Sequence, residues 1–198
     1  MGTGSHRTVT LYAAQAEPVW QAICRQGTAY SRAEYVQKKY GESAPVFLTA
    51  YDWFVSQLPR FVPKPPEAAY PYWAFTDPCL MERAGFAHIL KLRLPIDQAV
   101  FFRPEDWNRI LQMEYLAEDA SAARFRQELK NRGLRSADVM LSPFYPDLRS
   151  QIQESWQNLF RHHKAVLQGE RPLKDLQAGL WCIQRSWVVE DNGVCIEN

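Results

Sequence analysis

Two stretches of the chain alternate between apolar and polar residues, as half-buried strands do. In HILKLRLP, residues 88–95, three leucines alternate with a lysine and an arginine. Thr8 to Ala14 has the same period, with Val9 and Leu11 on one face. Two shorter stretches are expected to form further strands: YPYWAF, residues 70–75, and QAVFF, residues 98–102.

Other segments carry the three- to four-residue spacing of amphipathic helices. Apolar side chains recur in this way from Ala50 to Leu58, and Pro59 ends the helix that they indicate. Prolines suited to a first helical turn open helices at Pro18, Pro104 and Pro146, and the last helix is expected to continue to about Gln168. Two more helices are expected, from the capping-box pattern at Ser31 to Gly41 and from about Ser121 to Arg132.

These elements predict an α+β protein in which a mostly antiparallel sheet packs against several helices. A chain of 198 residues suits one domain, which is placed at residues 8–198. Residues 1–7 are expected to be disordered or derived from a tag. The proline-rich segment at 59–71 is expected to be a surface loop, because strand signals resume directly after it. Asn192-Gly193 predicts a hairpin turn.

Charge and cysteine content narrow the class of partner and the compartment. A net charge of +1 provides no general field for nucleic acid or for an anionic membrane, so neither is expected as a partner. No stretch approaches the roughly 18 apolar residues of a membrane-spanning helix. The four cysteines have neither a CxxC pair nor a zinc-site spacing, which is typical of reduced thiols in a cytoplasmic protein.

Motifs that bind common cofactors or hydrolyse common substrates are missing. The sequence has no Walker A loop, no GxGxxG, no GxSxG and no HExxH. His162 and His163 are neighbours on an expected helix and point about 100° apart, so they cannot chelate one metal ion together. Glu17 at the first helix start would repel a phosphate there. Neither a metal ion nor a cofactor is therefore expected.

Polar side chains set among large aromatic residues are the candidates for a ligand site. A polar small molecule, of a nucleotide type, is expected to contact Gln15, Tyr30, Tyr51, Trp53 and Gln184, with Glu154 as the candidate catalytic carboxylate. Gln15 stands between the first strand and the first helix, although glutamine is not a preferred helix cap. Gln184 has apolar neighbours in WCIQRSW, and a buried amide needs hydrogen-bond partners.

Each candidate also has a simpler structural explanation. The amides of Gln15 and Gln184 can bond to nearby backbone, Glu154 can be a solvated helix residue, and the tryptophans can belong to the core. Two functions stay open: a small cytoplasmic enzyme or enzyme-like protein with an aromatic-lined pocket, or a non-catalytic module that docks a peptide or protein partner through an aromatic face. One pocket shared by Gln15, Tyr51, Gln184 and Glu154 would favour the first.

Several segments occur in the order found in a known family. They are LYAAQ, AYDWFVSQLPRFVPKP, YPYWAF, LKLRLPIDQAVFFRPEDWNRIL, ESWQNLF and IQRSW. Together they resemble a bacterial family of small, soluble, single-domain proteins of unknown function, over residues 9 to 188 approximately. The resemblance implies a shared site without naming its chemistry, and its signature positions are Gln15, Tyr51, Trp53, Trp73, Trp107, Trp156 and Gln184. Asn108 departs from it, since many members carry a histidine there.

A weaker likeness in element order is to ADP-ribosyltransferase-type folds. These begin with a strand that carries an aromatic residue, followed by a helix and a glycine. The likeness implies a catalytic glutamate on a late strand, where Glu190 is the nearest match. Tyr12 and Gln15 occupy the neighbourhood in which such folds place an arginine or a histidine.

Overall fold

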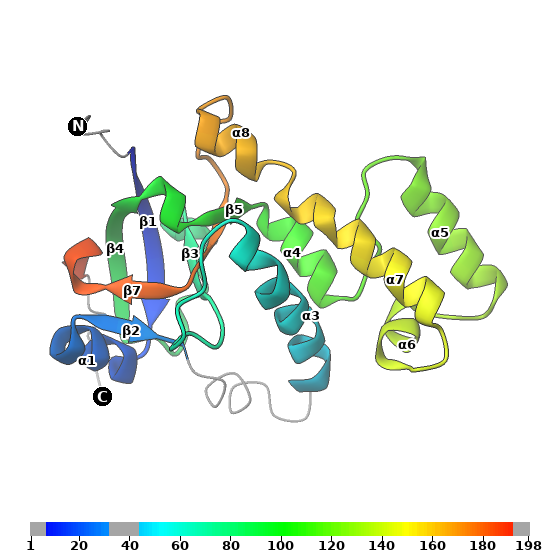
Figure 1. Ribbon diagram of the computed structural model, residues 1–198, viewed down its shortest axis with the longest axis horizontal. Coiled ribbons are helices and arrows are strands. Elements are labelled where there is room, and N and C mark those ends of the chain that lie inside the picture. Colours follow the sequence, from blue (N-terminus) through cyan, green and yellow to red (C-terminus); the bar gives the residue numbers. More distant parts are fainter. Residues whose placement is uncertain (1–6, 32–43, 192–198) are drawn as a thin grey trace.

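The computed structural model describes residues 7–31 and 44–191 (Figure 1). The strands of its main sheet are β1 (Thr8–Gln15), β3 (Tyr72–Phe75), β4 (His88–Pro95), β5 (Val100–Phe102), β6 (Gln177–Leu180) and β8 (Val188–Asp191). Within the described residues their order is β5-β6-β3-β1-β4-β8, and every neighbouring pair is antiparallel. A smaller sheet pairs β2 (Thr28–Tyr30) with β7 (Cys182–Gln184).

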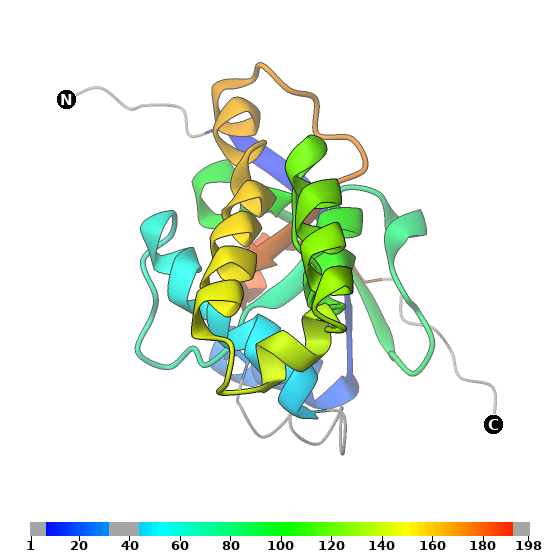
Figure 2. The same ribbon diagram turned by 90° about the vertical axis from the view of Figure 1, so that its right-hand side faces the viewer.

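Most of the helices lie toward the end of the molecule opposite the β2–β7 sheet (Figure 1). The helices are α1 (Glu17–Gln26), α3 (Ala44–Gln57), α4 (Pro104–Leu111), α5 (Ala120–Asn131), α6 (Ser136–Leu141), α7 (Pro146–Ser155) and α8 (His163–Gln168). Short 3-10 turns are η2 (Leu58–Arg60), η3 (Pro78–Leu80), η4 (Ile96–Gln98), η5 (Trp156–Phe160) and η6 (Arg185–Trp187). Figure 2, viewed from the helical end, shows α5 and α7 in front of the sheet.

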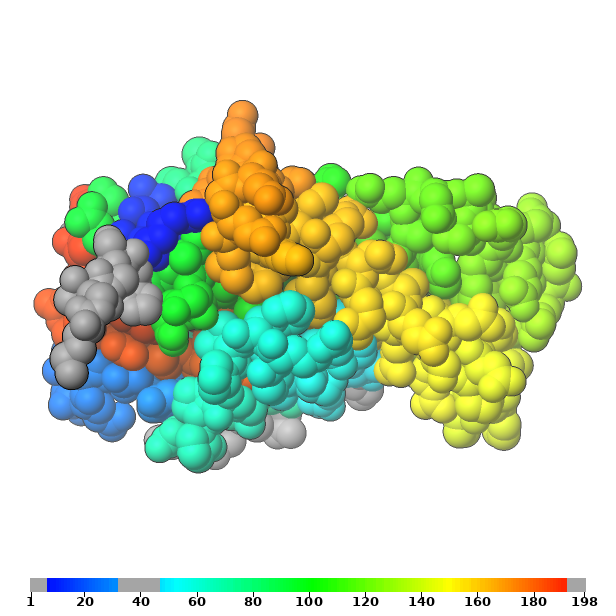
Figure 3. All heavy atoms as spheres, turned by 45° about the horizontal axis from the view of Figure 1, so that its top comes forward, coloured from blue at the N-terminus to red at the C-terminus, as the bar shows by residue number. Residues whose placement is uncertain are grey.

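The predicted α+β class and the mostly antiparallel sheet are confirmed. Helices at Pro18, Pro104 and Pro146 are confirmed as well, each with proline in its first turn. The helix expected from Ser31 to Gly41 and the turn expected at Asn192-Gly193 lie outside the described residues. Arg7, the last residue of the segment expected to be disordered or derived from a tag, contacts the fold: its guanidinium donates to the carbonyl of Val166 at 2.6 Å. Figure 3 shows the start of β1 beside α8.

The main sheet carries a hydrophobic core on each of its two faces. On one face, α3, α4 and η5 supply aromatic side chains that pack against the sheet around Phe54 and Phe102. On the other, the β2–β7 pair and α1 cover a row formed by Val9, Leu11 and Ala13 of β1. The alternation along β1 therefore sends every second side chain into the second core.

Gly179 lets helix α3 approach the sheet closely. A Cβ atom at this position would lie 3.0 Å from two atoms of the Phe54 ring. The same ring packs edge-on against Trp73, with centroids 5.2 Å apart. Gly179 thus fixes where α3 and the indole of Trp73 lie relative to the sheet.

The expectation of one continuous helix from Pro146 to Gln168 is wrong. The α-helix ends at Ser155, whose hydroxyl donates to the carbonyl of Ile152 at 2.6 Å and accepts from the amide of Leu116 at 2.8 Å. Trp156 then donates through Nε1 to the carbonyl of Glu114 at 2.7 Å. These bonds to the segment after α4 tighten the chain into a 3-10 turn, an effect that helical periodicity does not record.

Candidate functional site

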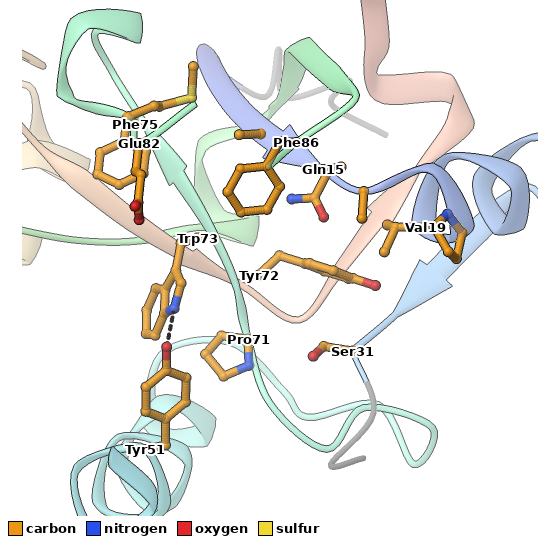
Figure 4. A pocket seen from close by; sticks show the side chains of 14 residues that line it. Gln15, Val19, Ser31, Tyr51, Pro71, Tyr72, Trp73, Phe75, Glu82 and Phe86 are labelled. Atoms are coloured by element: carbon orange, nitrogen blue, oxygen red, sulfur yellow. Dashed lines mark hydrogen bonds between the residues drawn. The ribbon is translucent and has the colours of Figure 1, made fainter. Parts of the chain in front are cut away.

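A pocket opens where two strands of the main sheet separate. β1 pairs with β4 from Thr8 opposite Pro95 to Gln15 opposite His88. With β3 it pairs at Tyr12 opposite Phe75, the one position recorded between these two strands in the described chain. Beyond that pair the strands diverge, and a pocket of about 370 Å³ lies between the end of β1, the first turn of α1, β3 and the segment 81–86 (Figure 4). We call it the aromatic pocket.

Gln15 supplies a buried amide to the aromatic pocket. It is the last residue of β1 and is only 6% exposed. The residue that caps α1 is Ala16, and no side chain caps that helix. Among the described residues, the Gln15 side chain has no hydrogen-bond partner. Figure 4 shows its amide between the rings of Phe86 and Tyr72.

The explanation that Gln15 links the first strand to the first helix makes a specific demand on its hydrogen bonds. An amide that linked the first strand to the first helix would bond to nearby backbone, and no such bond is present in the described chain. The residue is buried as a whole, but its amide atoms border the open pocket: among the described residues, the one fully buried side-chain nitrogen or oxygen without a hydrogen-bond partner is Asp191 Oδ1. The amide of Gln15 therefore offers one acceptor and two donor hydrogens to a molecule in the pocket.

Aromatic side chains form much of the pocket wall. Trp73 donates through Nε1 to the hydroxyl of Tyr51 at 2.8 Å, and the two rings meet edge to face at 5.5 Å. This bond links β3 to α3 on the side of the sheet that faces the helices (Figure 4). Tyr72 and Phe86 lie on the other side of β3, next to Gln15. The aromatic rings that form these walls can stack on a flat ligand ring. The hydrophobic core behind them fixes their positions.

The charge of the aromatic pocket is slightly negative. Its lining includes the carboxylate of Glu82, which is exposed at the rim, and no lysine, arginine or histidine of the described chain. Glu17 follows two residues after Gln15 at the start of α1. A phosphate or carboxylate in this pocket would therefore be repelled, whereas a neutral ring would not.

His88 holds the first turn of α1, and so one wall of the pocket, against the sheet. Its Nε2 lies 2.6 Å from Glu17 and its Nδ1 lies 2.9 Å from Asp191 of β8. Trp20 of α1 packs on the imidazole, with ring centroids 5.3 Å apart. Burial lowers the pKa of His88, but the hydrogen bonds to both carboxylates outweigh it and raise the pKa overall. The bond to His88 in turn lowers the pKa of Glu17.

A second hollow adjoins the aromatic pocket. It has a volume of about 480 Å³ and shares Pro18, Val19 and Tyr72 with the aromatic pocket as common walls. Its other walls come from α1, β2 and Glu67. Because its lining includes Arg25 and Glu67, we call it the polar cavity.

The structure brings together some of the residues expected at a ligand site. Gln15 and Tyr51 both line the aromatic pocket, and Tyr30 lines the polar cavity beside it. Trp53 lies instead in the core, 7% exposed, where it stacks on Phe160 and meets Trp156 edge to face. Its place in the apolar helical stripe from Ala50 to Leu58 already indicated a core position.

Gln184 and Glu154 lie away from the pocket that contains Gln15. Gln184 ends β7 opposite Thr28 and accepts from Ser186 at 3.4 Å, so it does not form the wall opposite Gln15. Glu154 is exposed on α7 and lines neither hollow. The expected convergence of both residues with Gln15 is therefore corrected: Gln184 follows its own strand pairing, and Glu154 faces solvent.

Tyr72, Ser31 and Phe86 are among the lining residues that the sequence did not indicate as ligand contacts. Tyr72 lies in the expected strand YWAF, and the two-residue period puts it on the opposite face from Trp73. That period was the signal that could have identified it. Ser31 and Phe86 lie in connecting segments, where residue spacing carries no information about which side chain faces a pocket.

Few groups with catalytic chemistry line the aromatic pocket in the described chain. Ser31 carries the one aliphatic hydroxyl group among the described lining residues. No histidine of that lining lies beside it to act as a base. In the described chain, no group of three or more His, Cys, Asp or Glu side chains is placed to hold a metal ion. No helix of that same part is long and apolar enough to span a membrane.

Comparison with known proteins places the chain in a family. A family model described as a domain of unknown function (DUF3841) matches residues 10–189. The chain therefore belongs to this family, which confirms the expectation of a domain-of-unknown-function family. No curated protein and no solved structure matches it.

Proposed function

We propose that the protein binds a small, flat, uncharged ring of the nucleobase type in the aromatic pocket. The observation that carries the proposal is the amide of Gln15, which is buried, faces the pocket and lacks a partner in the described chain. A nucleobase edge places a hydrogen-bond donor next to an acceptor. A glutamine amide matches such an edge with two parallel bonds, as it does with adenine.

The walls of the pocket support a flat ring. Tyr72 and Phe86 flank the amide of Gln15, and Trp73 adds a further aromatic surface. Stacking of a base on an aromatic side chain contributes about 1–3 kcal/mol. The lack of a cation in the described lining, together with Glu82 at the rim, favours a neutral ring. Adenine is therefore the first ring to test.

The proposal is for binding, and the enzyme alternative has less support. Glu154 is the candidate catalytic carboxylate, and Glu190 is the residue nearest to the late-strand glutamate of ADP-ribosyltransferase-type folds. Glu190 pairs with Lys91 at 3.3 Å on β8 and lines neither hollow. Docking of a protein partner through an aromatic face also has less support, because Trp53, Trp107 and Trp156 are buried. The unpaired thiols of Cys24, Cys79 and Cys182 favour a cytoplasmic location.

The proposal is tested by measuring thermal stability with adenine, guanine, cytosine and uracil, followed by titration calorimetry. The variants are Gln15→Met, which keeps the length of the side chain, and Gln184→Met as the matched control outside the pocket. Wild type and Gln184→Met are expected to be stabilised by adenine, since a ligand of the native state raises the melting temperature. Gln15→Met is expected to bind at least about tenfold more weakly, because it loses a bidentate pair. Equal affinity of Gln15→Met, or no stabilisation by any base, would refute the proposal.

A further inference from the structure

The polar cavity adjoins the aromatic pocket, and three residues form walls of both. Pro18, Val19 and Tyr72 are these shared wall residues, so a molecule seated beside Gln15 would reach the polar cavity by passing Tyr72. The far walls of the polar cavity belong to α1 and β2 and include Arg25 and Tyr30. The two hollows differ in chemistry, since the second has charges of both signs.

Arg25 and Glu67 are the two charged residues of the polar cavity within the described chain. Neither forms a hydrogen bond or an ion pair with another described residue. Burial raises the pKa of the Tyr30 phenol, and the nearby Cys182 and Glu67 raise it further. The phenol therefore stays protonated and can donate, while Glu67 can only accept and Arg25 can only donate.

This set of groups suits hydroxyl groups better than an anion. A sugar hydroxyl both donates and accepts, so neighbouring hydroxyls can serve Glu67 and Arg25 at once. A carboxylate that accepts from a ribose hydroxyl is a recurrent element of nucleotide-binding proteins. A phosphate would meet Arg25 but would be repelled by Glu67. Arg25 also lies in the last turn of α1, where the helix dipole is negative.

We propose that the ligand is a nucleoside, whose base binds Gln15 in the aromatic pocket and whose neutral sugar binds Glu67 and Arg25 in the polar cavity. This inference rests on the proposed function. It adds that the sugar contributes to affinity and that a 5′-phosphate does not. The protein thereby distinguishes a nucleoside from both its free base and its nucleotide.

Titration calorimetry of the full chain with adenine, adenosine, 2′-deoxyadenosine and adenosine 5′-monophosphate tests the inference. Adenosine is expected to bind about tenfold more tightly than adenine, because its hydroxyl groups form further hydrogen bonds to charged groups, part of whose contribution is offset by ordering costs. Deoxyadenosine and the monophosphate are expected to bind more weakly than adenosine. Glu67→Gln is expected to abolish the advantage of adenosine over adenine and to leave adenine binding unchanged.

The outcomes separate this inference from the proposed function. If adenine binds through Gln15 but adenosine binds no better, the nucleoside inference fails and the base site stands. Tighter binding of the monophosphate than of adenosine would also overturn the nucleoside inference. If neither adenine nor adenosine binds, the proposed function fails with it. Arg25→Gln gives an independent readout: a weakened preference for adenosine supports the sugar site, and an unchanged preference contradicts it.

Discussion

Trp73 and Tyr51 join the sheet to helix α3 through one hydrogen bond, from the indole Nε1 to the phenolic oxygen at 2.8 Å. Tyr51 is 5% exposed, so little water can replace it as the acceptor. Tyr51→Phe keeps the ring and leaves the indole N–H without this partner. It is expected to lower the free energy of unfolding by about 1–2 kcal/mol, measured by urea denaturation.

Tyr70→Phe is the control for that variant. The Tyr70 hydroxyl donates to Asp52 at 2.9 Å in an exposed position, where water can replace the phenol. Its loss is expected to cost less than the loss of the Tyr51 hydroxyl. Equal costs of the two substitutions would show that the bond between Trp73 and Tyr51 is not specially protected.

The contact between Gly179 and Phe54 predicts that even one methyl group is too large there. Gly179→Ala would place Cβ 3.0 Å from the Phe54 ring. We expect a loss of about 1–3 kcal/mol in stability, because the ring must shift within a packed core. In the Phe54→Leu background, the added methyl is expected to cost less. Additive effects of the two substitutions would contradict the steric explanation.

The buried imidazole of His163 makes the free energy of unfolding depend on pH. Its imidazole is 4% exposed, and Nδ1 accepts from the amide of Phe101 at 3.3 Å on the edge strand β5. Burial lowers the pKa of His163 from 6.5 to about 4. The unfolded state therefore takes up a proton before the folded state, and stability is lost as pH falls from 6.5 to about 4. The expected loss is about 3 kcal/mol.

Denaturation of wild type and His163→Gln across this pH range tests the assignment. The variant is expected to start from a lower stability at pH 7 and to lose less of it on acidification. A loss as steep as that of wild type would assign the acid sensitivity to other groups.

The contacts of His88 with Glu17 and Asp191, which we call the His88 clamp, contribute stability that is lost as pH rises. The raised pKa of His88 gives a contribution that is complete below 6.5 and is lost as pH rises through the folded-state pKa. The lowered pKa of Glu17 gives one that is present above 4.5 and lost as pH falls through its folded-state value. The clamp is thus strongest between 4.5 and 6.5.

Hydrogen exchange in the first turn of α1 measures this clamp. The amides of Val19 and Trp20 donate to the carbonyl of Ala16 at 3.0 and 3.2 Å and report opening of that turn. Their protection, corrected for intrinsic exchange, is expected to decrease above the pKa of His88 in wild type. His88→Gln is expected to abolish this pH dependence. A decrease that persists in His88→Gln would exclude the clamp as its cause.

The sequence contained most of the information that determines the elements of the fold. The two-residue period of HILKLRLP predicted β4, and the prolines at 18, 104 and 146 predicted three helix starts. The end of α7 at Ser155 could not be predicted in this way, because it depends on bonds to Glu114 and Leu116, far away in the chain. Local spacing does not encode such tertiary bonds.

The candidate site was predictable in part. Gln15 stood out because glutamine is an unusual residue at a strand-to-helix junction, and it does line the pocket. The expected opposite wall, Gln184, rested on its apolar neighbours, but its strand pairs with β2 instead. Phe86 comes from a loop whose path across the pocket depends on the assembled sheet. Burial and neighbours follow from residue patterns, whereas convergence on one pocket follows from topology.

The side-chain amide of Gln15 can be observed directly by NMR. Its ¹⁵N-labelled NH₂ signals are assigned by their loss in Gln15→Met, and the protein is then titrated with adenosine. Saturable shifts of these signals, with the same dissociation constant as calorimetry, are the result that a ligand bonded to Gln15 predicts. Unchanged Gln15 signals at adenosine concentrations that saturate binding would contradict a base bound to Gln15, and so would the absence of any binding.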